Sequence, residues 1–397
     1  MRGYVIGVPR REIERVLIWM TSKRTALAAL TICARFAVVE CGGGIAVSST
    51  SAAPSTPSQT LRIYGERHNL LMGAAVDSQS LASEPIYASM LAAEYSELEP
   101  ENEMKFGPIH PEPATYDYEG PDALVAFAQA NSIKVRGHSL VWHSQQPDWV
   151  AAPAVPWTPQ TLNKVLADHI ANVVGHFKGK VYAWDVVNEP FNDDGTMRST
   201  LWYDKPGIGF AGKGTKTIEQ ALLWAHAADP DAKLFVNEYG AETLSRKSDA
   251  MYAMARDFVK RGVPLTGVGF QLHVGTGFDE PDKLRSLGQN MKRFAALGLE
   301  VQFTEVDVQL HDGSASSLAA QAGTYGDLLN ECVRQPACTL FQTWGFTDKH
   351  SWIPATYPGL GWALPFDKNY NKKPAFTAML KKLKGRGYVG PRPKTSR

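Results

Sequence analysis

The sequence has no excess of charge of either sign. Its 41 lysines and arginines balance 40 aspartates and glutamates, which leaves a formal net charge of +1 over 397 residues. A nearly neutral chain argues against nucleic acid or an anionic membrane surface as the main partner. We therefore expect no nucleic-acid partner, and a neutral polymer or a small molecule as the ligand.

Cysteine is scarce. Only four cysteines occur, and no two of them are spaced as Cys-x-x-Cys, which argues against a zinc knuckle. Cys332 and Cys338 flank a turn-like stretch over residues 333–337 that can bring them together. We predict a disulfide between these two cysteines, which would agree with export to an oxidising compartment.

The sequence also has no apolar run long enough for a transmembrane helix, which needs about 20 such residues. The apolar run over residues 26–34 follows Lys23 and Arg24. A basic stretch followed by a short apolar run is typical of the start of a secretory signal, with Met20 as an alternative start. We therefore predict a leader over residues 1–47 and no membrane-spanning segment.

The leader hypothesis predicts a secreted protein, either extracellular or periplasmic. A lipid anchor at Cys41 is an alternative, which Glu40 weakens because a small residue is expected directly before an acylated cysteine. A disordered cytoplasmic tail is a third interpretation of the same segment.

Residues 48–60 are rich in serine, threonine and proline and have little to bury, so we predict a flexible linker there. We expect a catalytic domain over residues 61–385 and a tail over residues 386–397. No internal repeat is visible, and no Gly-x-Gly-x-x-Gly follows the first expected strand, which argues against a dinucleotide-binding fold.

Apolar strand-like runs alternate with amphipathic stretches at helical spacing along this domain. The runs cover residues 70–76, 95–104, 134–142, 181–187, 233–237, 265–273, 299–308 and 339–346. The helical stretches cover residues 121–130, 158–177, 217–228, 246–261, 281–297, 317–333 and 374–383. Eight strands, each followed by a helix or a long loop, predict a single α/β (β/α)₈ TIM barrel.

Two of the strand-like runs carry acids at or near their C-terminal ends, where a buried strand should have none. The run VQFTEVDVQ over residues 301–309 contains Glu305 and Asp307, and the run KVYAWDVVNE over residues 180–189 ends at Glu189. A buried carboxylate is costly unless it is paired, hydrogen-bonded or used. Glu189 and Glu305 together supply the acid and the carboxylate that glycoside hydrolysis requires.

The other strand ends are rich in polar and aromatic residues as well. In a TIM barrel the active site lies at the C-terminal ends of the strands. The residues at these ends are Glu101, Asn102, Lys105, His138, Trp142, His143, Gln145, Asn188, Glu189, Asn237, Glu238, Tyr239, Gln271, His273, Glu305, Asp307, Trp344, Asp348, Lys349 and Trp352. Caps and salt bridges explain one or two such residues per strand, but not nearly every strand end.

These residues carry a resemblance to glycoside hydrolase family 10, the endo-1,4-β-xylanases (EC 3.2.1.8). Six blocks match in order over about residues 70–383: ENEMK at 101–105, RGHSLVWHSQ at 136–145, WDVVNE at 184–189, GFQLH at 269–273, FTEVD at 303–307 and WGFTDKHSW at 344–352. The resemblance implies an endo-1,4-β-xylanase that hydrolyses internal β-1,4-xylosidic bonds of xylan by a retaining double displacement. It implies no cofactor and no metal, with xylan and xylo-oligosaccharides as partners; we expect a monomer.

The resemblance also assigns roles. Glu305 matches the family's nucleophile and Glu189 its acid/base, while His273 and Asp307 match residues that orient the nucleophile. Asn188 matches the residue that hydrogen-bonds the sugar 2-hydroxyl, a contact that strengthens in the transition state.

Ten further residues are expected to bind the sugar chain, and Trp352 and its neighbours are expected to favour xylose over glucose by crowding the space of a hydroxymethyl group. The ten are Glu101, Asn102, Lys105, His138, Trp142, Gln145, Tyr239, Gln271, Trp344 and Trp352. The chain departs from the family at Phe106, often Trp, at Pro190, often Ala, and at Gly240, often Asn. Gly240 is expected to weaken a leaving-group-side subsite.

Three other interpretations remain open at this stage. His138, His143 and His273 could be metal ligands, although no His-x-His or His-Glu-x-x-His spacing occurs. The barrel could be a carbohydrate-binding protein that has lost activity, which the presence of both glutamates argues against. The polymer could instead be a mixed-linkage β-glucan.

Overall fold

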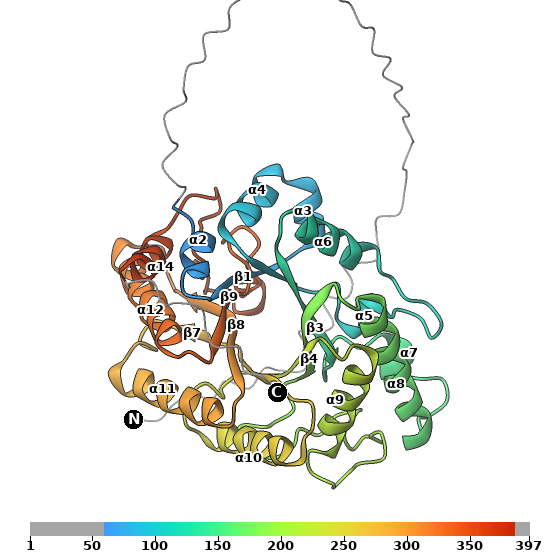
Figure 1. The fold of residues 1–397 in the computed structure, drawn as a ribbon. Helices are drawn as coiled ribbons and strands as arrows, with labels where there is room; N and C mark the ends of the chain where they lie inside the picture. Colours follow the sequence, from blue (N-terminus) through green and yellow to red (C-terminus); the bar gives the residue numbers. More distant parts are fainter. Residues whose placement is uncertain (1–58, 386–397) are drawn as a thin grey trace, which may run out of the picture. The chain divides into compact units, whose positions relative to one another are not determined.

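Parallel strands form the centre of the molecule and helices surround them in the computed structural model, which describes residues 59–385 (Figure 1). Every strand pairing in the sheet is parallel. The strands are β1 (Leu71–Val76), β2 (Glu97–Pro100), β3 (Lys134–Val141), β4 (Val181–Asn188), β5 (Lys233–Glu238), β6 (Gly267–Phe270), β7 (His273–Gly275), β8 (Glu300–Gln309) and β9 (Cys338–Thr343).

The sheet closes on itself. Its strand order is β6-β5-β4-β3-β2-β1-β9-β8-β7, and β6 also pairs with β8. β6 and β7 pair with successive parts of β8, at Gly267↔Glu300 and at His273↔Asp307. They are therefore two halves of one barrel strand, and the predicted (β/α)₈ barrel of eight strand positions is confirmed.

The expected strand over residues 265–273 was wrong in one respect, because it is interrupted. Leu272 has φ 63°, in the left-handed region, and its N–H donates to the Glu242 side chain instead of continuing the ladder. The expected strand over residues 95–104 is also shorter. It ends at Pro100, and the chain then turns into α5 (Phe106–Ile109).

All seven expected helices are present. They are α6 (Glu119–Ala130), α8 (Pro159–His176), α9 (Lys216–Ala228), α10 (Arg246–Arg261), α11 (Pro281–Ala296), α12 (Ala315–Arg334) and α14 (Pro374–Lys384). Six shorter helices were not expected: α2 (Leu61–Glu66), α3 (Ser78–Ser83), α4 (Pro85–Glu94), α5, α7 (Asp148–Ala151) and α13 (Ile353–Thr356). Capping boxes at Thr158 and Ser245 start α8 and α10 by satisfying free N–H groups.

The interior of the barrel contains a charged cluster. The fully buried Arg136 of β3 donates to Glu99 of β2 and to Asp185 of β4. Burial raises the pKa of the neighbouring Glu97 well above its ordinary value, and repulsion from Glu99 adds to the rise despite attraction to Arg136. The barrel interior beneath the strand ends is therefore polar, and the carboxylates of Glu99 and Asp185 neutralise the Arg136 guanidinium.

Cys332 at the end of α12 and Cys338 at the start of β9 form a disulfide. Within residues 59–385, no helix has the length and apolar character needed to cross a bilayer. The predicted leader (residues 1–47, with Cys41), the predicted tail (residues 386–397) and residues 48–58 of the predicted linker lie outside the described residues.

Candidate active site

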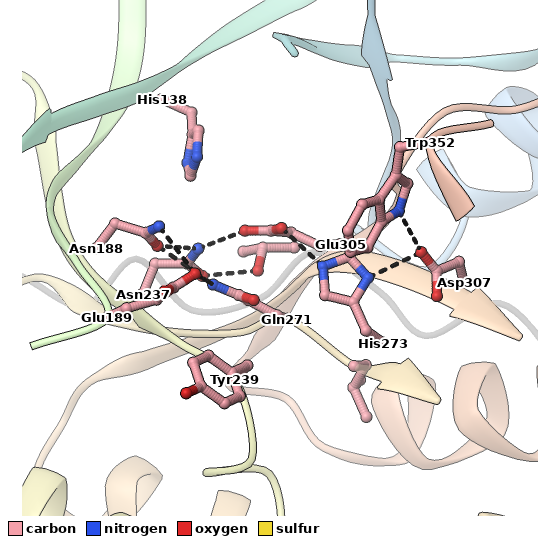
Figure 2. Close-up of polar contacts among 12 residues, drawn as sticks. His138, Asn188, Glu189, Asn237, Tyr239, Gln271, His273, Glu305, Asp307 and Trp352 are labelled. Atoms are coloured by element: carbon pink, nitrogen blue, oxygen red, sulfur yellow. Dashed lines mark hydrogen bonds and ion pairs between the residues drawn. The ribbon is translucent and has the colours of Figure 1, made fainter. Parts of the chain in front are cut away.

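A cavity of about 930 Å³ opens at the C-terminal ends of the strands. Ten residues predicted to bind substrate and four of the five predicted catalytic residues line it: Glu101, Asn102, Lys105, His138, Trp142, Gln145, Tyr239, Gln271, Trp344, Trp352, Asn188, Glu189, His273 and Glu305. Asp307 does not line the cavity and lies behind His273 (Figure 2). The polar strand ends therefore converge on one cleft.

Glu305 of β8 is nearly completely buried and receives hydrogen bonds on both oxygens. Asn237 Nδ2 lies 2.7 Å from Oε1, and His273 Nε2 lies 3.0 Å from Oε2. Burial opposes ionisation, but the bond and charge from His273, the charge of His138 and the bond from Asn237 outweigh it and lower the pKa of Glu305. This carboxyl is held ionised.

His273 is held between two carboxylates. Its Nδ1 lies 2.8 Å from Asp307 Oδ2, which also accepts a hydrogen bond of 2.9 Å from Trp352 Nε1 (Figure 2). Burial opposes the charged imidazolium, yet Asp307 and Glu305 raise the pKa of His273 from 6.5 to about 10. His273 is therefore a cation at neutral pH that donates to Glu305 and Asp307 at once.

Glu189 stands directly after β4 with an unusual backbone. Its φ of 54° is left-handed, and its N–H donates to Asn237 O at 2.9 Å. Its Oε1 accepts from Gln271 Nε2 at 3.2 Å, and His143 Nδ1 lies 3.7 Å from its Oε2. No arginine or lysine forms an ion pair with this carboxyl among the described residues, in contrast to the cation at Glu305.

A chain of amides connects the two glutamates. Asn237 Nδ2 bonds both Glu305 and, at 2.9 Å, Asn188 Oδ1. Asn188 Oδ1 also accepts from Gln271 Nε2 at 3.3 Å, and that same nitrogen reaches Glu189 (Figure 2). Glu189 and Glu305 are thus fixed within one hydrogen-bonded network.

One end of the cleft combines a buried lysine with tryptophan rings. Lys105 Nζ lies 3.1 Å from Asn102 Oδ1, 5.0 Å from the centre of the Trp142 ring and 5.6 Å from that of Trp344. Burial lowers the pKa of Lys105 despite the charge of Glu101, and burial raises the pKa of Glu101 to about 7 despite the charge of Lys105. Donors, acceptors and flat rings side by side suit the hydroxyls and faces of a sugar.

Glu99, His138 and Asp185 are the cluster within the described residues whose ligand atoms lie close enough to hold a metal. Arg136 already hydrogen-bonds both carboxylates of this cluster, and His138 Nδ1 lies 2.8 Å from Asp185 Oδ2. The guanidinium supplies the positive charge that a metal would bring, so these residues do not fit a metal centre. His143 and His273, the other histidines considered as ligands, face Glu189 and Glu305 instead.

Sequence reasoning missed two groups of residues. Asn237 was noted at a strand end, but its link to Glu305 was not expected, and the contact of Arg198 to the Glu189 backbone was not foreseen. Nine further lining residues were not expected: Glu242, Thr243, Val274, Gly275, Thr276, Phe278, Lys283, Thr356 and Tyr357. Gly240, which was expected to affect a leaving-group-side subsite, also lines the cleft. Asp348 and Lys349, also at a strand end, point elsewhere and pair with Lys373 and Glu84.

A (β/α)₈ barrel with two glutamates at its strand ends, one held ionised and one hydrogen-bonded to side-chain amides, is typical of glycoside hydrolases. The model of glycosyl hydrolase family 10 matches residues 61–382. The chain belongs to this family.

Individual relatives agree with the family. The chain is 40% identical over 337 residues to endo-1,4-β-xylanase B of Thermotoga neapolitana, covering 82% of this chain and 93% of that protein. The crystal structure of native xylanase 10B from Thermotoga maritima is similar, with 40% identity, a TM-score of 0.77 and coverage of 82% and 98%. Xylanase 10B from Thermotoga petrophila in complex with xylobiose gives the same identity and TM-score, with coverage of 82% and 97%.

Proposed function

We propose that the protein is an endo-1,4-β-xylanase that hydrolyses internal β-1,4-xylosidic bonds of xylan by retaining double displacement. The proposal rests on the different surroundings of two glutamates that share one hydrogen-bond network. Glu305 has a lowered pKa and accepts from His273, whereas Glu189 has amide and imidazole neighbours. The relatives named above are xylanases, and one of them was crystallised with xylobiose, which supports the choice of xylan.

In the first step, Glu305 attacks the anomeric carbon and the glycosidic C–O bond breaks. Glu189 gives its proton to the leaving oxygen, so the products of this step are a shortened chain with a free hydroxyl and a xylosyl ester of Glu305. Asn188 holds the 2-hydroxyl of the reacting sugar, with its side chain oriented by Asn237 and Gln271.

In the second step, Glu189, now ionised, takes a proton from water while the water oxygen attacks the same carbon. The bond to Glu305 breaks, and its carboxylate is regenerated with Glu189 protonated. Two inversions at one carbon leave the product in the β configuration of the substrate.

The remaining lining residues are proposed to hold the polymer. Lys105, Asn102 and Gln145 bond sugar hydroxyls, and Trp142 and Trp344 stack on the sugar faces. Trp352 is fixed by its bond to Asp307 and crowds the position of a hydroxymethyl group. A steric difference of this size discriminates by about 1–3 kcal/mol, so xylan is preferred over a β-glucan without excluding it.

The direct test is release of reducing ends from xylan by the purified protein. Glu305→Ala should abolish release, because no nucleophile remains, while isothermal titration still detects xylo-oligosaccharide binding. A chelator should leave the rate unchanged. Loss of activity on chelation would contradict the proposal in favour of a metal-dependent hydrolase, and a faster initial rate on mixed-linkage β-glucan than on xylan would contradict the choice of polymer.

We further propose that the protein is a secreted monomer whose catalytic domain spans residues 61–385, after a leader and a linker. The basic and apolar order of the leader and the Cys332–Cys338 disulfide support secretion, and the linker composition supports the start of the domain.

A further inference from the structure

Arg198 has no part in the steps above. It nevertheless makes four hydrogen bonds around Glu189, none of which the sequence predicted. Its Nε donates to the backbone oxygen of Glu189 at 2.9 Å. Its Nη2 donates to Phe191 O at 3.1 Å and to the Tyr239 hydroxyl at 3.0 Å. Its own N–H donates to Pro190 O at 2.8 Å. One residue thus binds three consecutive carbonyls beginning at Glu189.

These contacts matter because Glu189 is in the left-handed region, with φ 54°. For a residue with a Cβ this conformation costs roughly 1–2 kcal/mol and persists only when the surroundings fix it. Asn237 O fixes the peptide group before Glu189 by accepting its N–H, and Arg198 fixes the peptide group after it. With both peptides held, the direction of the Glu189 side chain into the cleft is set.

The guanidinium acts on the backbone and not on the carboxyl. Burial opposes its charge, but the hydrogen bond to Tyr239 and the charges of Glu238 and Glu189 outweigh burial and raise the pKa of Arg198, so it stays a cation. Among the described residues Arg198 makes no ion pair. A direct salt bridge would favour the ionised form of Glu189, whereas a bond to its carbonyl fixes the group and leaves the carboxyl free to hold a proton.

We propose that Arg198 is a positioning residue that directs the Glu189 carboxyl at the leaving oxygen of the scissile bond. The inference rests on the proposed function, because it requires Glu189 to be the proton donor. Only arginine fits the position, since its planar fork donates in two directions, to Glu189 and to Phe191 and Tyr239, which a lysine ammonium cannot reproduce.

The test compares substrates that differ in their need for a proton. Dinitrophenyl β-xylobioside loses a leaving group that needs no protonation, whereas the phenyl analogue depends on the acid. In Arg198→Met, kcat/KM, which reports the first step, should fall about 100-fold for the phenyl substrate, the low end of a general acid's contribution. It should fall less than about threefold for the dinitrophenyl substrate, because binding and attack by Glu305 are kept.

Arg62→Met is the matched control. Arg62 is also partly buried and donates to backbone oxygens, those of Ala92, Asn131 and Ser132. Unlike Arg198 it also pairs with a carboxylate, that of Glu66, and it lies in α2 and does not line the cleft. Its substitution should lower both kcat/KM values equally or leave them unchanged. If Arg198→Met does not yield folded protein, Arg198→Lys replaces it, since that variant keeps the charge and the stem and loses only the fork.

Glu189→Gln separates the inference from the proposed function. It should show the same dependence on the leaving group, only larger. If Glu189→Gln shows none, Glu189 is not the acid and the proposed function is wrong at this residue. If Glu189→Gln shows the dependence and both Arg198 variants lose activity equally on the two substrates, Arg198 is only structural and the inference is wrong.

Discussion

At the scale of single residues, the two glutamates differ because of what surrounds them. Glu305 is bonded by a cationic histidine, and that histidine is charged because Asp307 faces its other nitrogen. Glu189 has neutral amides and the partly buried His143, whose pKa is lowered by burial and by the charge of Arg198 against the attraction of Glu189. Two carboxyls with different roles need such separated environments.

Replacing Asp307 with Asn tests this chain of charges. Without Asp307, the pKa of His273 should fall, the imidazole should become neutral in the working range, and the pKa of Glu305 should rise. The acid limb of the kcat/KM profile on xylan should therefore move to higher pH. An unmoved limb, with His273 still protonated at neutral pH by NMR, would show that Asp307 does not control this charge.

The same pKa shift has a consequence for stability. Because the pKa of His273 is raised from 6.5 to about 10, its stabilisation is fully present below pH 6.5 and is lost as the pH rises toward 10. Asp307→Asn should flatten this part of the pH dependence of the unfolding free energy. Urea unfolding of both proteins at several pH values between these limits measures the effect, and parallel curves would contradict it.

At the residue scale, the sequence identified site residues where a polar or acidic residue interrupts an otherwise apolar strand. Glu189, Glu305 and the polar strand ends stood out because acids and amides interrupt apolar strands, and the structure brings them to one cavity. Arg198 could not be found in this way, because its partners are backbone oxygens and a hydroxyl, and no pattern of side chains identifies a bond to a carbonyl.

At the scale of elements, close contact between β3 and β4 positions the strand that leads to Glu189. Gly137 of β3 pairs with Trp184 of β4, and a Cβ at Gly137 would lie 2.2 Å from Trp184 Cε3. Trp184 is completely buried and cannot move aside. Because Gly137 has no side chain, the Trp184 indole can pack against it inside the barrel. Trp184 precedes Glu189 by five residues in the sequence.

Gly137→Ala should therefore destabilise the protein by about 1–3 kcal/mol, as overpacking of cores does. Gly175→Ala in α8 is the control, since nothing lies within 4 Å of a Cβ there; it should stabilise the protein by about 0.5–1 kcal/mol, because alanine favours helix more than glycine does. Both are measured by urea unfolding. Equal effects of the two substitutions would refute the packing argument.

The period of the apolar residues predicted the long helices and strands well, because their buried faces repeat over many residues. It could not predict the break between β6 and β7. Residues 265–273 read as one continuous apolar run, and the interruption depends on the Glu242 carboxyl accepting the Leu272 N–H, a contact from a distant loop. Short helices such as α3 and α7 were missed because their six and four residues show too little of a repeat.

At the scale of the whole molecule, the described residues form one closed barrel, and a disulfide links two of its elements near the C-terminal end of the described range. Cys332 and Cys338 join the end of α12 to β9, and both are buried. Replacing both with alanine should lower the unfolding free energy by about 2 kcal/mol through the entropy of the opened loop. Thermal unfolding of the alanine variant and of the parent protein measures this loss, and an unchanged midpoint would contradict a structural role.

Retaining hydrolysis by this protein requires the two glutamates, which stand on separate strands, to act on the two sides of one acetal carbon. NMR of the first product released from xylohexaose, recorded before mutarotation, tests it most directly. The new reducing end should form in the β configuration. A first-formed α anomer would mean a single displacement and would rule out a covalent intermediate on Glu305.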